Sequence, residues 1–189
     1  MNLLKFFFDF ILSLFLISFL AAPFLFLCIV IKLDSPGPII YWSDRVGINN
    51  IIFKMPKLRT MKVGTEVVAT HLIRDPSKSL TKIGSFLRSY SLDEIPQLFS
   101  VIKGDMSLVG PRPALFNQYD LISQRERKQV NQLKPGITGW AQVNGRDELS
   151  ISTKVQYDEE YLKRASMSFD IYIISLTIIR AIRKDGISH

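Results

Sequence analysis

Cysteine and histidine are scarce in this chain, and their scarcity excludes several kinds of site. The only cysteine, Cys28, lies inside an apolar stretch near the N-terminus, so no disulfide forms within the chain. A chain without a disulfide framework suits a reducing compartment. The two histidines, His71 and His189, have no cluster of cysteines beside them. A structural zinc site is therefore not expected.

Several nucleotide-binding motifs are also missing. The sequence contains no G-x-G-x-x-G and no G-x-x-x-x-G-K-[ST], so nothing in it predicts a dinucleotide site or a P-loop. It has no D-x-D triplet, which argues against the usual metal-binding motif of nucleotide-sugar glycosyltransferases. No signature of a nucleic-acid-binding fold occurs either, and we expect no nucleic-acid partner.

Positive charge, by contrast, is in excess. The 24 lysines and arginines outnumber the 17 aspartates and glutamates, which gives a net charge of +7 over 189 residues. Such an excess favours anionic partners, among them acidic lipids and phosphorylated substrates. The length corresponds to one domain, with room for an appendage.

The appendage is predicted at the N-terminus, where residues 6–31 contain only three strongly polar side chains. This run exceeds the roughly 20 residues that span a bilayer as a helix. Pro23 removes a backbone donor and should bend that helix. Either the kinked helix crosses the membrane, or it breaks and returns with both ends on one side. Lys5 and Lys32 flank both ends, so the positive-inside rule does not decide, and base rates favour the spanning form.

Two adjacent carboxylates, Asp93 and Glu94, stand in the middle of the chain. Ser91 followed three residues later by Glu94 is a capping-box pattern, which would give both carboxylates a purely structural role. Pro96 argues against that pattern, because it would fall where the helical N–H already bonds back. We therefore predict an irregular turn and a helix that starts near Pro96. Carboxylates on such a turn are expected to be ionised and to point outward.

Several cations near this turn are candidate phosphate ligands. Residues 54–62 hold four of them, including Lys57 and Arg59, and form either a lipid-headgroup patch or a phosphate-binding edge. Two flanking prolines hold Arg112 extended, which presets its guanidinium for phosphate; the alternative is an exposed arginine in a rigid turn. The remaining candidates are two arginines and an aromatic ring able to stack on a base or lie in the membrane interface: Arg88, Arg146 and Trp140.

The other predicted elements are short. Strand, turn and helix patterns indicate hairpins at 39–54 and around Asn144-Gly145, a strand at 106–109, and helices at 80–90, 97–102, 114–133 and 169–182. Residues 63–79 are polar and predict a mobile loop. Arg125 and Asp158 are expected to be solvated on exposed helical faces.

With these features together, the sequence closely resembles a known family, the small monotopic polyprenyl-phosphate phosphoglycosyl transferases, or bacterial sugar transferases. The resemblance covers nearly the whole chain. It is carried by the apolar helix with Lys5, Asp9 and a central proline, Asp34-Ser35-Pro36-Gly37-Pro38, Arg45-Val46-Gly47, Lys57-Leu58-Arg59-Thr60-Met61, Leu87-Arg88-Ser89, residues 91–98, Lys103-Gly104-Asp105-Met106-Ser107, Gly110-Pro111-Arg112-Pro113 and residues 134–146.

This resemblance implies an α+β, mainly helical fold with short β-hairpin elements and interfacial amphipathic helices. Residues 1–33 would form a re-entrant membrane helix broken at Pro23, with both ends in the cytoplasm. Residues 34–189 would form a catalytic domain on the cytoplasmic face of the bacterial inner membrane. The family's break is typically Ser-Pro, whereas here Ala22 precedes the proline.

The reaction that the resemblance implies is transfer of a phospho-sugar from a UDP-sugar to undecaprenyl phosphate, with release of UMP, as the first membrane step of surface glycan assembly. Asp93 would be the nucleophile that forms an acyl-phosphate intermediate, and Glu94, beside Asp93, would hold Mg²⁺. The substrate-binding residues implied are Lys57, Arg59, Arg88, Arg112, Arg146 and Trp140. Two alternatives stay open: direct displacement without a covalent intermediate, and a non-catalytic membrane tether that binds acidic lipid. The sequence identifies neither the sugar nor the glycan pathway, and it leaves a homodimer open.

Overall fold

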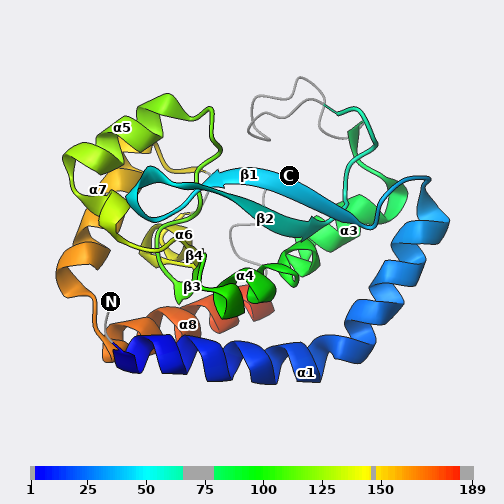
Figure 1. Cartoon of the computed structure of the whole chain (residues 1–189), viewed down its shortest axis with the longest axis horizontal. Helices are drawn as coiled ribbons and strands as arrows, with labels where there is room; N and C mark the ends of the chain where they lie inside the picture. The colour runs from blue at the N-terminus through cyan, green and yellow to red at the C-terminus, as the bar shows by residue number, and fades with distance from the viewer. Residues whose placement is uncertain (1–2, 66–78, 146–147, 184–189) are drawn as a thin grey trace.

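The computed structural model describes residues 3–65, 79–145 and 148–183, which are mainly helical with short strands, as predicted (Figure 1). The elements in chain order are α1 (Leu3–Asp34), β1 (Ile40–Val46), η1 (Ile48–Asn50), β2 (Ile52–Leu58), α3 (Lys82–Ser89), η3 (Leu92–Glu94), α4 (Gln97–Lys103), β3 (Ser107–Val109), α5 (Tyr119–Arg127), η4 (Val130–Gln132), β4 (Gly136–Thr138), α6 (Trp140–Val143), α7 (Ile151–Arg164) and α8 (Met167–Arg183).

The longest element, α1, has 32 residues and is long and apolar enough to cross a membrane. Many of its large apolar side chains are exposed, among them Phe19 at 72 % and Leu33 at 82 %. An apolar surface of this kind marks contact with lipid or with another protein. Pro23 lies inside α1 without ending it. Figure 1 shows α1 running along one side of the molecule and then turning toward α3. The helix is thus continuous through Pro23, and its path through a bilayer stays a prediction.

Both ends of α1 are attached to the same folded body. Near its start, the Lys5 ammonium contacts Asp170 of α8 at 2.5 Å, and Asp9 accepts a 2.7 Å hydrogen bond from Ser107 of β3. Near its end, Ile31 is only 1 % exposed, because it lies in a cluster with side chains of β2 and α3. The two ends are therefore fixed relative to each other by the domain between them.

The first predicted hairpin is confirmed. β1 and β2 are antiparallel, with Ile40 opposite Leu58, and the second strand extends past the predicted end at residue 54. Asn49 and Asn50 take positive φ in the connection, a conformation that asparagine tolerates. Because β2 continues to Leu58, Lys57 is held on a strand rather than in a loose basic segment.

The hairpin predicted at Asn144-Gly145 is wrong. The preceding residues form the short helix α6, and the Asn144 side chain donates to the Trp140 carbonyl at 2.7 Å. An Asn-Gly pair indicates a hairpin only when strands flank it on both sides. The strand that precedes α6, β4, instead pairs in parallel with β3, so that Ser107 lies opposite Gly136.

The main core lies between α4, β3, α7 and α8, around Val101, Val109 and Ile173. Side chains from the first half of α1 pack against it, including Leu12 and Leu16. The remaining short elements predicted from the sequence are confirmed as α3, α4, β3 and α8. The apolar periodicity of these segments was thus a sufficient guide to their type.

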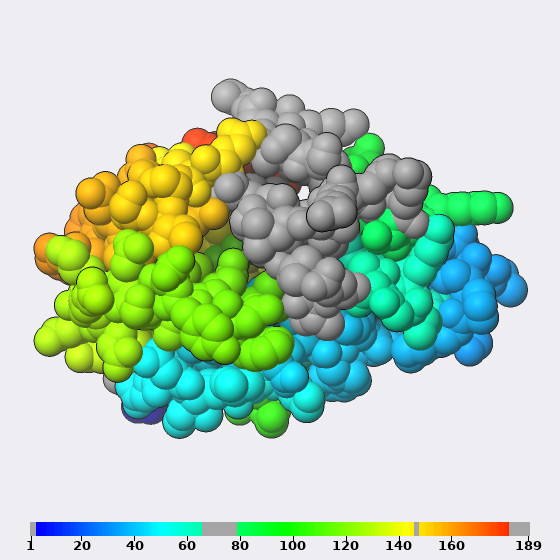
Figure 2. Space-filling model, turned by 90° about the horizontal axis from the view of Figure 1, so that it is seen from above, coloured from blue at the N-terminus to red at the C-terminus, as the bar shows by residue number. Residues whose placement is uncertain are grey.

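The region around α5 differs from the prediction. The helix expected at 114–133 is divided into α5 and the turn η4. Arg125 and Asp158, both expected to be solvated, form an ion pair between α5 and α7, with side chains 11 % and 2 % exposed. The pattern of a single helix does not reveal which neighbour covers its charged face. Seen from above, this part of the chain lies against the β1–β2 hairpin (Figure 2). Most of the loop predicted at 63–79 lies outside the described residues.

Candidate active site

The Asp93-Glu94 pair lies on η3, a 3-10 turn between α3 and α4. Ser91 takes the left-handed conformation, with φ 54°, and its side chain makes no capping hydrogen bond. Pro96 is the residue that precedes α4. The predicted irregular turn and helix start are therefore confirmed, and the capping-box alternative is wrong.

Two cations from distant parts of the chain meet the carboxylates. The Lys57 ammonium lies 2.8 Å from Glu94 Oε1 and 3.4 Å from Asp93 Oδ2. The Arg112 guanidinium reaches the same Glu94 oxygen at 3.3 Å. The structure thus brings together four of the predicted site residues in a cluster of two carboxylates and two cations.

Asp93 is the more deeply placed carboxylate, with 6 % of its surface exposed, so the prediction that both carboxylates point outward is wrong for it. Burial raises the pKa of the Asp93 carboxyl above its ordinary value of 3.8. Lys57 and Arg88 lower that pKa and Glu94 raises it, and the effect of burial prevails. A desolvated carboxylate with cations at its edge is typical of a reactive group rather than of a surface charge.

Two further arginines that were predicted to bind substrate, Arg88 and Arg59, have hydrogen-bond partners within the fold. Arg88 Nε donates to Thr60 Oγ1 at 3.0 Å, and its charge favours the ionised form of Asp93. Arg59 is 5 % exposed and donates to both carbonyls of residues 35–36, in the turn that follows α1, and to the hydroxyl of that turn. Arg59 therefore holds the exit from α1, and its part in substrate binding stays a prediction.

Trp140 is also engaged within the fold. Its indole N–H donates to Glu160 at 2.8 Å, its ring lies 5.1 Å from that of Phe169, and the Arg164 guanidinium lies 5.7 Å above it. These contacts join α6, α7 and α8, so stacking of Trp140 on a base stays a prediction. Arg146 lies outside the described residues.

A cleft of about 260 Å³ opens beside Glu94 and Arg112. Apolar side chains of α4, β4 and α6 form part of its wall, and α8 contributes Thr177 and Arg180. Thr177 is bonded through its hydroxyl to Thr138 at 2.7 Å. The contribution of α8 was not predicted from the sequence, although a threonine and an arginine three residues apart share one helical face.

Gln142 of α6 is a second residue that the sequence analysis missed. It lines the same cleft, and its side-chain amide donates to the Ile137 carbonyl at 2.8 Å. Its own carbonyl oxygen is buried and has no hydrogen-bond partner among the described residues. A buried acceptor without a partner is costly, which favours a donor group from a ligand at this wall.

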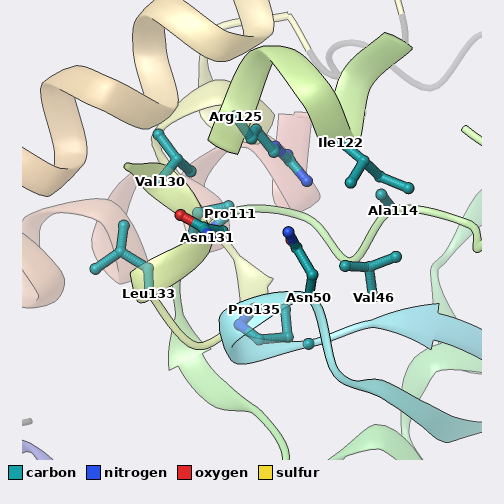
Figure 3. A pocket seen from close by; sticks show the side chains of 11 residues that line it. Val46, Asn50, Pro111, Ala114, Ile122, Arg125, Val130, Asn131, Leu133 and Pro135 are labelled. Carbon is teal, nitrogen blue, oxygen red and sulfur yellow. The ribbon is translucent and has the colours of Figure 1, made fainter. Parts of the chain in front are cut away.

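A second cavity, of only about 30 Å³, lies beside Pro111 (Figure 3). In Figure 3, Arg125 extends from α5 toward Asn50 of the hairpin turn, and Asn131 lies beside them. The volume suits about one water molecule. None of the described residues that line this cavity is a carboxylate, so it is not a candidate for the chemistry.

The carboxylate pair fits Mg²⁺ in one particular way. Among the described residues, no group of three or more Asp, Glu, His or Cys converges on one point. Mg²⁺ is commonly held by one or two carboxylates, with substrate phosphates and water as the other ligands. Glu94, which lines the cleft and has a side chain 15 % exposed, suits such a site better than Asp93, whose side chain is 8 % exposed.

The fold and this site define a class of protein: a membrane-associated enzyme with paired carboxylates set among cations. The family model described as bacterial sugar transferase matches residues 1–184, and the chain belongs to that family. This match confirms the resemblance seen in the sequence, and with it the enzyme class, phosphoglycosyl transferase.

Three relatives show how widely the family is spread. The uncharacterized sugar transferase EpsL of Bacillus subtilis is 36 % identical over 98 % of this chain and 90 % of its own length. The UDP-glucose:undecaprenyl-phosphate glucose-1-phosphate transferase of Xanthomonas campestris is 42 % identical over 80 % of this chain. An N-acetylgalactosaminephosphotransferase of Aeromonas hydrophila, named for UDP-N-acetylgalactosamine and undecaprenyl phosphate, is 36 % identical over 79 % of it. The chain spans only 33 % and 37 % of the latter two proteins.

Proposed function

We propose that this protein transfers a phospho-sugar from a UDP-sugar to undecaprenyl phosphate and releases UMP, as the first membrane step of surface glycan assembly. The observation that carries the proposal is the buried Asp93 beside Glu94, with Lys57 and Arg112 in contact with the pair. Relatives named for this reaction support it. Because those relatives are named for different sugars, they do not identify the donor.

The reaction proceeds in two steps through Asp93. An oxygen of the Asp93 carboxylate attacks the phosphorus that carries the sugar, a new P–O bond forms, and the bond to UMP breaks with its electron pair leaving on UMP. An oxygen of the lipid phosphate then attacks the same phosphorus and releases the Asp93 carboxylate. A carboxylate nucleophile divides one difficult transfer into two easier ones.

The cations act on the charge of the transferring group. Arg112 and Lys57 lie beside the carboxylates and offset the negative charge of the donor's phosphates, an effect that is strong where water is excluded. Mg²⁺, held by Glu94, would supply further positive charge to these phosphates. The Lys57 ammonium lies closer to Glu94, at 2.8 Å, than to Asp93, at 3.4 Å. Asp93 therefore keeps an oxygen available for nucleophilic attack.

The acceptor phosphate enters by the cleft between α4 and α8. Arg180 lines this cleft together with Arg112, and Ile95 and Leu98 make part of its wall apolar. α8 belongs to the core against which the first half of α1 packs. The cleft therefore joins a cationic site to the side of the molecule that carries the apolar helix, which suits a phosphate on a long hydrocarbon chain.

The same structure supports a re-entrant course for α1. Its start is bonded to Asp170 and Ser107, and its end is buried against β2 and α3 of the same domain. A helix whose two ends are held by one domain returns to the side from which it entered. Labelling a cysteine placed at residue 2, in a Cys28→Ser background, tests this in intact cells. Access from the outside would rule out the re-entrant course.

The chemistry is tested by the intact mass of the protein after incubation with Mg²⁺ and a panel of UDP-sugars, without acceptor. We expect a phospho-sugar adduct on the wild type and none on Asp93→Asn. UMP release only when undecaprenyl phosphate is present, with no adduct, would instead favour direct displacement. If membrane binding survives but neither adduct nor UMP appears with any donor, the chain is a lipid-binding tether.

A further inference from the structure

The segment that carries Arg112 is held in place through its carbonyl groups. Its two prolines have no N–H to donate, so residues 111–114 contribute few backbone donors. Yet each of its four carbonyl oxygens accepts a hydrogen bond. Backbone N–H groups donate to the first and the last, from Gly136 to Pro111 at 2.9 Å and from Val46 to Ala114 at 3.0 Å. Guanidinium groups donate to the middle two, from Arg125 to Arg112 at 2.8 Å and from Arg45 to Pro113 at 3.0 Å. Two of these donors are side chains from β1 and α5, so the position of the segment depends on other elements of the fold.

Arg125 makes the bond to the Arg112 carbonyl itself. Its guanidinium is oriented by Asp158, whose Oδ2 atom accepts from Nε at 2.9 Å and lies 2.7 Å from Nη2. Because the Asp158 side chain is 2 % exposed and belongs to α7, the pair links two helices and the Arg112 segment at one point. The carboxylate also offsets the charge of Arg125, so the pair brings little net field to the active site.

We propose that Arg125, fixed by Asp158, is a positioning residue for Arg112. By holding the Arg112 main chain, it sets where the Arg112 guanidinium meets Glu94 and the phosphate of the donor; the functional part of this inference rests on the proposed function. A planar guanidinium presents donors in fixed directions, so one side chain bonds both a carboxylate and a carbonyl. A lysine ammonium in the same place cannot hold this geometry.

The size of the effect follows from the geometry of transfer. Displacement of a substrate-holding group by about 1 Å costs on the order of 100-fold in rate. We therefore expect loss of the Arg125 bond to lower kcat/KM by about 10- to 100-fold, mainly through kcat, because the offset of charge matters most in the transition state.

Removing Arg125 alone leaves Asp158 buried without its partner and risks misfolding. The test therefore uses Arg125→Met combined with Asp158→Leu, which removes both charges and replaces them with apolar side chains of similar length. Arg127→Ala, on the exposed face of the same helix, is the matched control. Each change is also made in an Arg112→Ala background, and UMP release is measured with the full chain in lipid nanodiscs.

The expected result is a 10- to 100-fold loss for the Met/Leu pair in the wild-type background and less than about threefold in the Arg112→Ala background. Equal losses in both backgrounds, or no loss in either, would overturn the proposal. Hydrogen exchange of a peptide covering residues 112–118 gives a readout that needs no turnover, and it should become faster with the Met/Leu pair only. Should the wild type release no UMP, the proposed function fails, and this exchange measurement alone decides whether Arg125 holds the segment.

Discussion

Two buried aspartates, Asp93 and Asp158, show how the same residue type serves two purposes in this fold. They are 6 % and 1 % exposed, and burial raises the pKa of both carboxyls. Asp158 has a dedicated partner, because two nitrogens of the Arg125 guanidinium lie within 2.9 Å of one of its oxygens. The Lys57 ammonium lies 3.4 Å from Asp93 and closer, at 2.8 Å, to Glu94, and the charge of Arg88 also lowers the pKa of Asp93.

Burial alone therefore does not identify a reactive carboxylate. A buried aspartate that is matched by a planar guanidinium is held in one orientation and serves the structure. A buried aspartate that shares its nearest cation with a neighbour keeps an oxygen for chemistry, at some cost in stability.

Asp93→Asn should lower UMP release by about 1,000-fold or more, because the amide is not a nucleophile for phosphorus. Release is measured with a UDP-sugar and undecaprenyl phosphate. Asp120→Asn, an exposed position on α5, is the control and should retain full activity. Residual release above a hundredth of the wild-type rate would contradict the nucleophilic role of Asp93.

Asp158→Asn should destabilise the protein by about 3–5 kcal/mol although burial also raises the pKa of this carboxyl, because the amide leaves the buried Arg125 charge without a carboxylate. Asp93→Asn differs in this respect, because Lys57 and Arg112 keep Glu94 as their partner. The measurement is the free energy of unfolding from a denaturant titration. The control is Glu126→Gln, at an exposed position of α5, the helix that carries Arg125. It should change the free energy of unfolding by less than about 0.5 kcal/mol. A loss for Asp158→Asn no larger than this would show that the Arg125–Asp158 pair does not stabilise the fold.

The same substitution at Asp93 should stabilise the protein. Because the pKa of Asp93 is raised in the folded state, the fold binds the neutral carboxyl more favourably than the carboxylate. The contribution of this carboxyl to the free energy of unfolding is therefore complete at pH below 3.8 and is lost as the pH rises through the folded pKa. Asparagine stays neutral, so Asp93→Asn should melt higher than the wild type at neutral pH, by about 2 °C or more. The gap should close as the pH falls toward about 4. A lower melting temperature at neutral pH would contradict this.

Lys57→Gln should move the acid limb of the pH–activity profile to higher pH. Lys57 lowers the pKa of Asp93, so its loss raises that pKa further and a higher pH is needed to ionise the nucleophile. The profile of kcat/KM against pH reports the shift. Lys54→Gln is the control, since Lys54 is on the same strand but pairs with Asp44 on the exposed side. An unshifted acid limb would show that another group controls activity.

The smallest effect is expected for Arg180→Ala. Loss of one partly exposed cation at the cleft should raise KM for undecaprenyl phosphate by about fivefold, with KM for the UDP-sugar nearly unchanged. Lys163→Ala on α7 is the comparison, because its charge lies on an exposed helical face. A rise in KM for the UDP-sugar alone would assign the cleft to the donor instead.

The local features of the fold follow from the sequence alone. Pro96 and its neighbours specify a turn before α4, two prolines fix the backbone around Arg112, and the apolar run specifies α1, because each follows from backbone sterics or hydrophobic periodicity within a few residues. The order of short motifs was also enough to indicate the family, which the family match confirms.

How these parts meet depends on the packing of elements that are far apart in the chain. The burial of Asp93, the pairing of Arg125 with Asp158 and the place of Arg180 in the cleft wall all depend on which elements pack together. Those contacts join residues far apart in the chain, and no periodicity within a single helix or strand encodes the partner that covers it. The charge cluster at Glu94 was therefore predictable as a set of residue types, whereas the desolvation that raises the pKa of Asp93 required the folded protein.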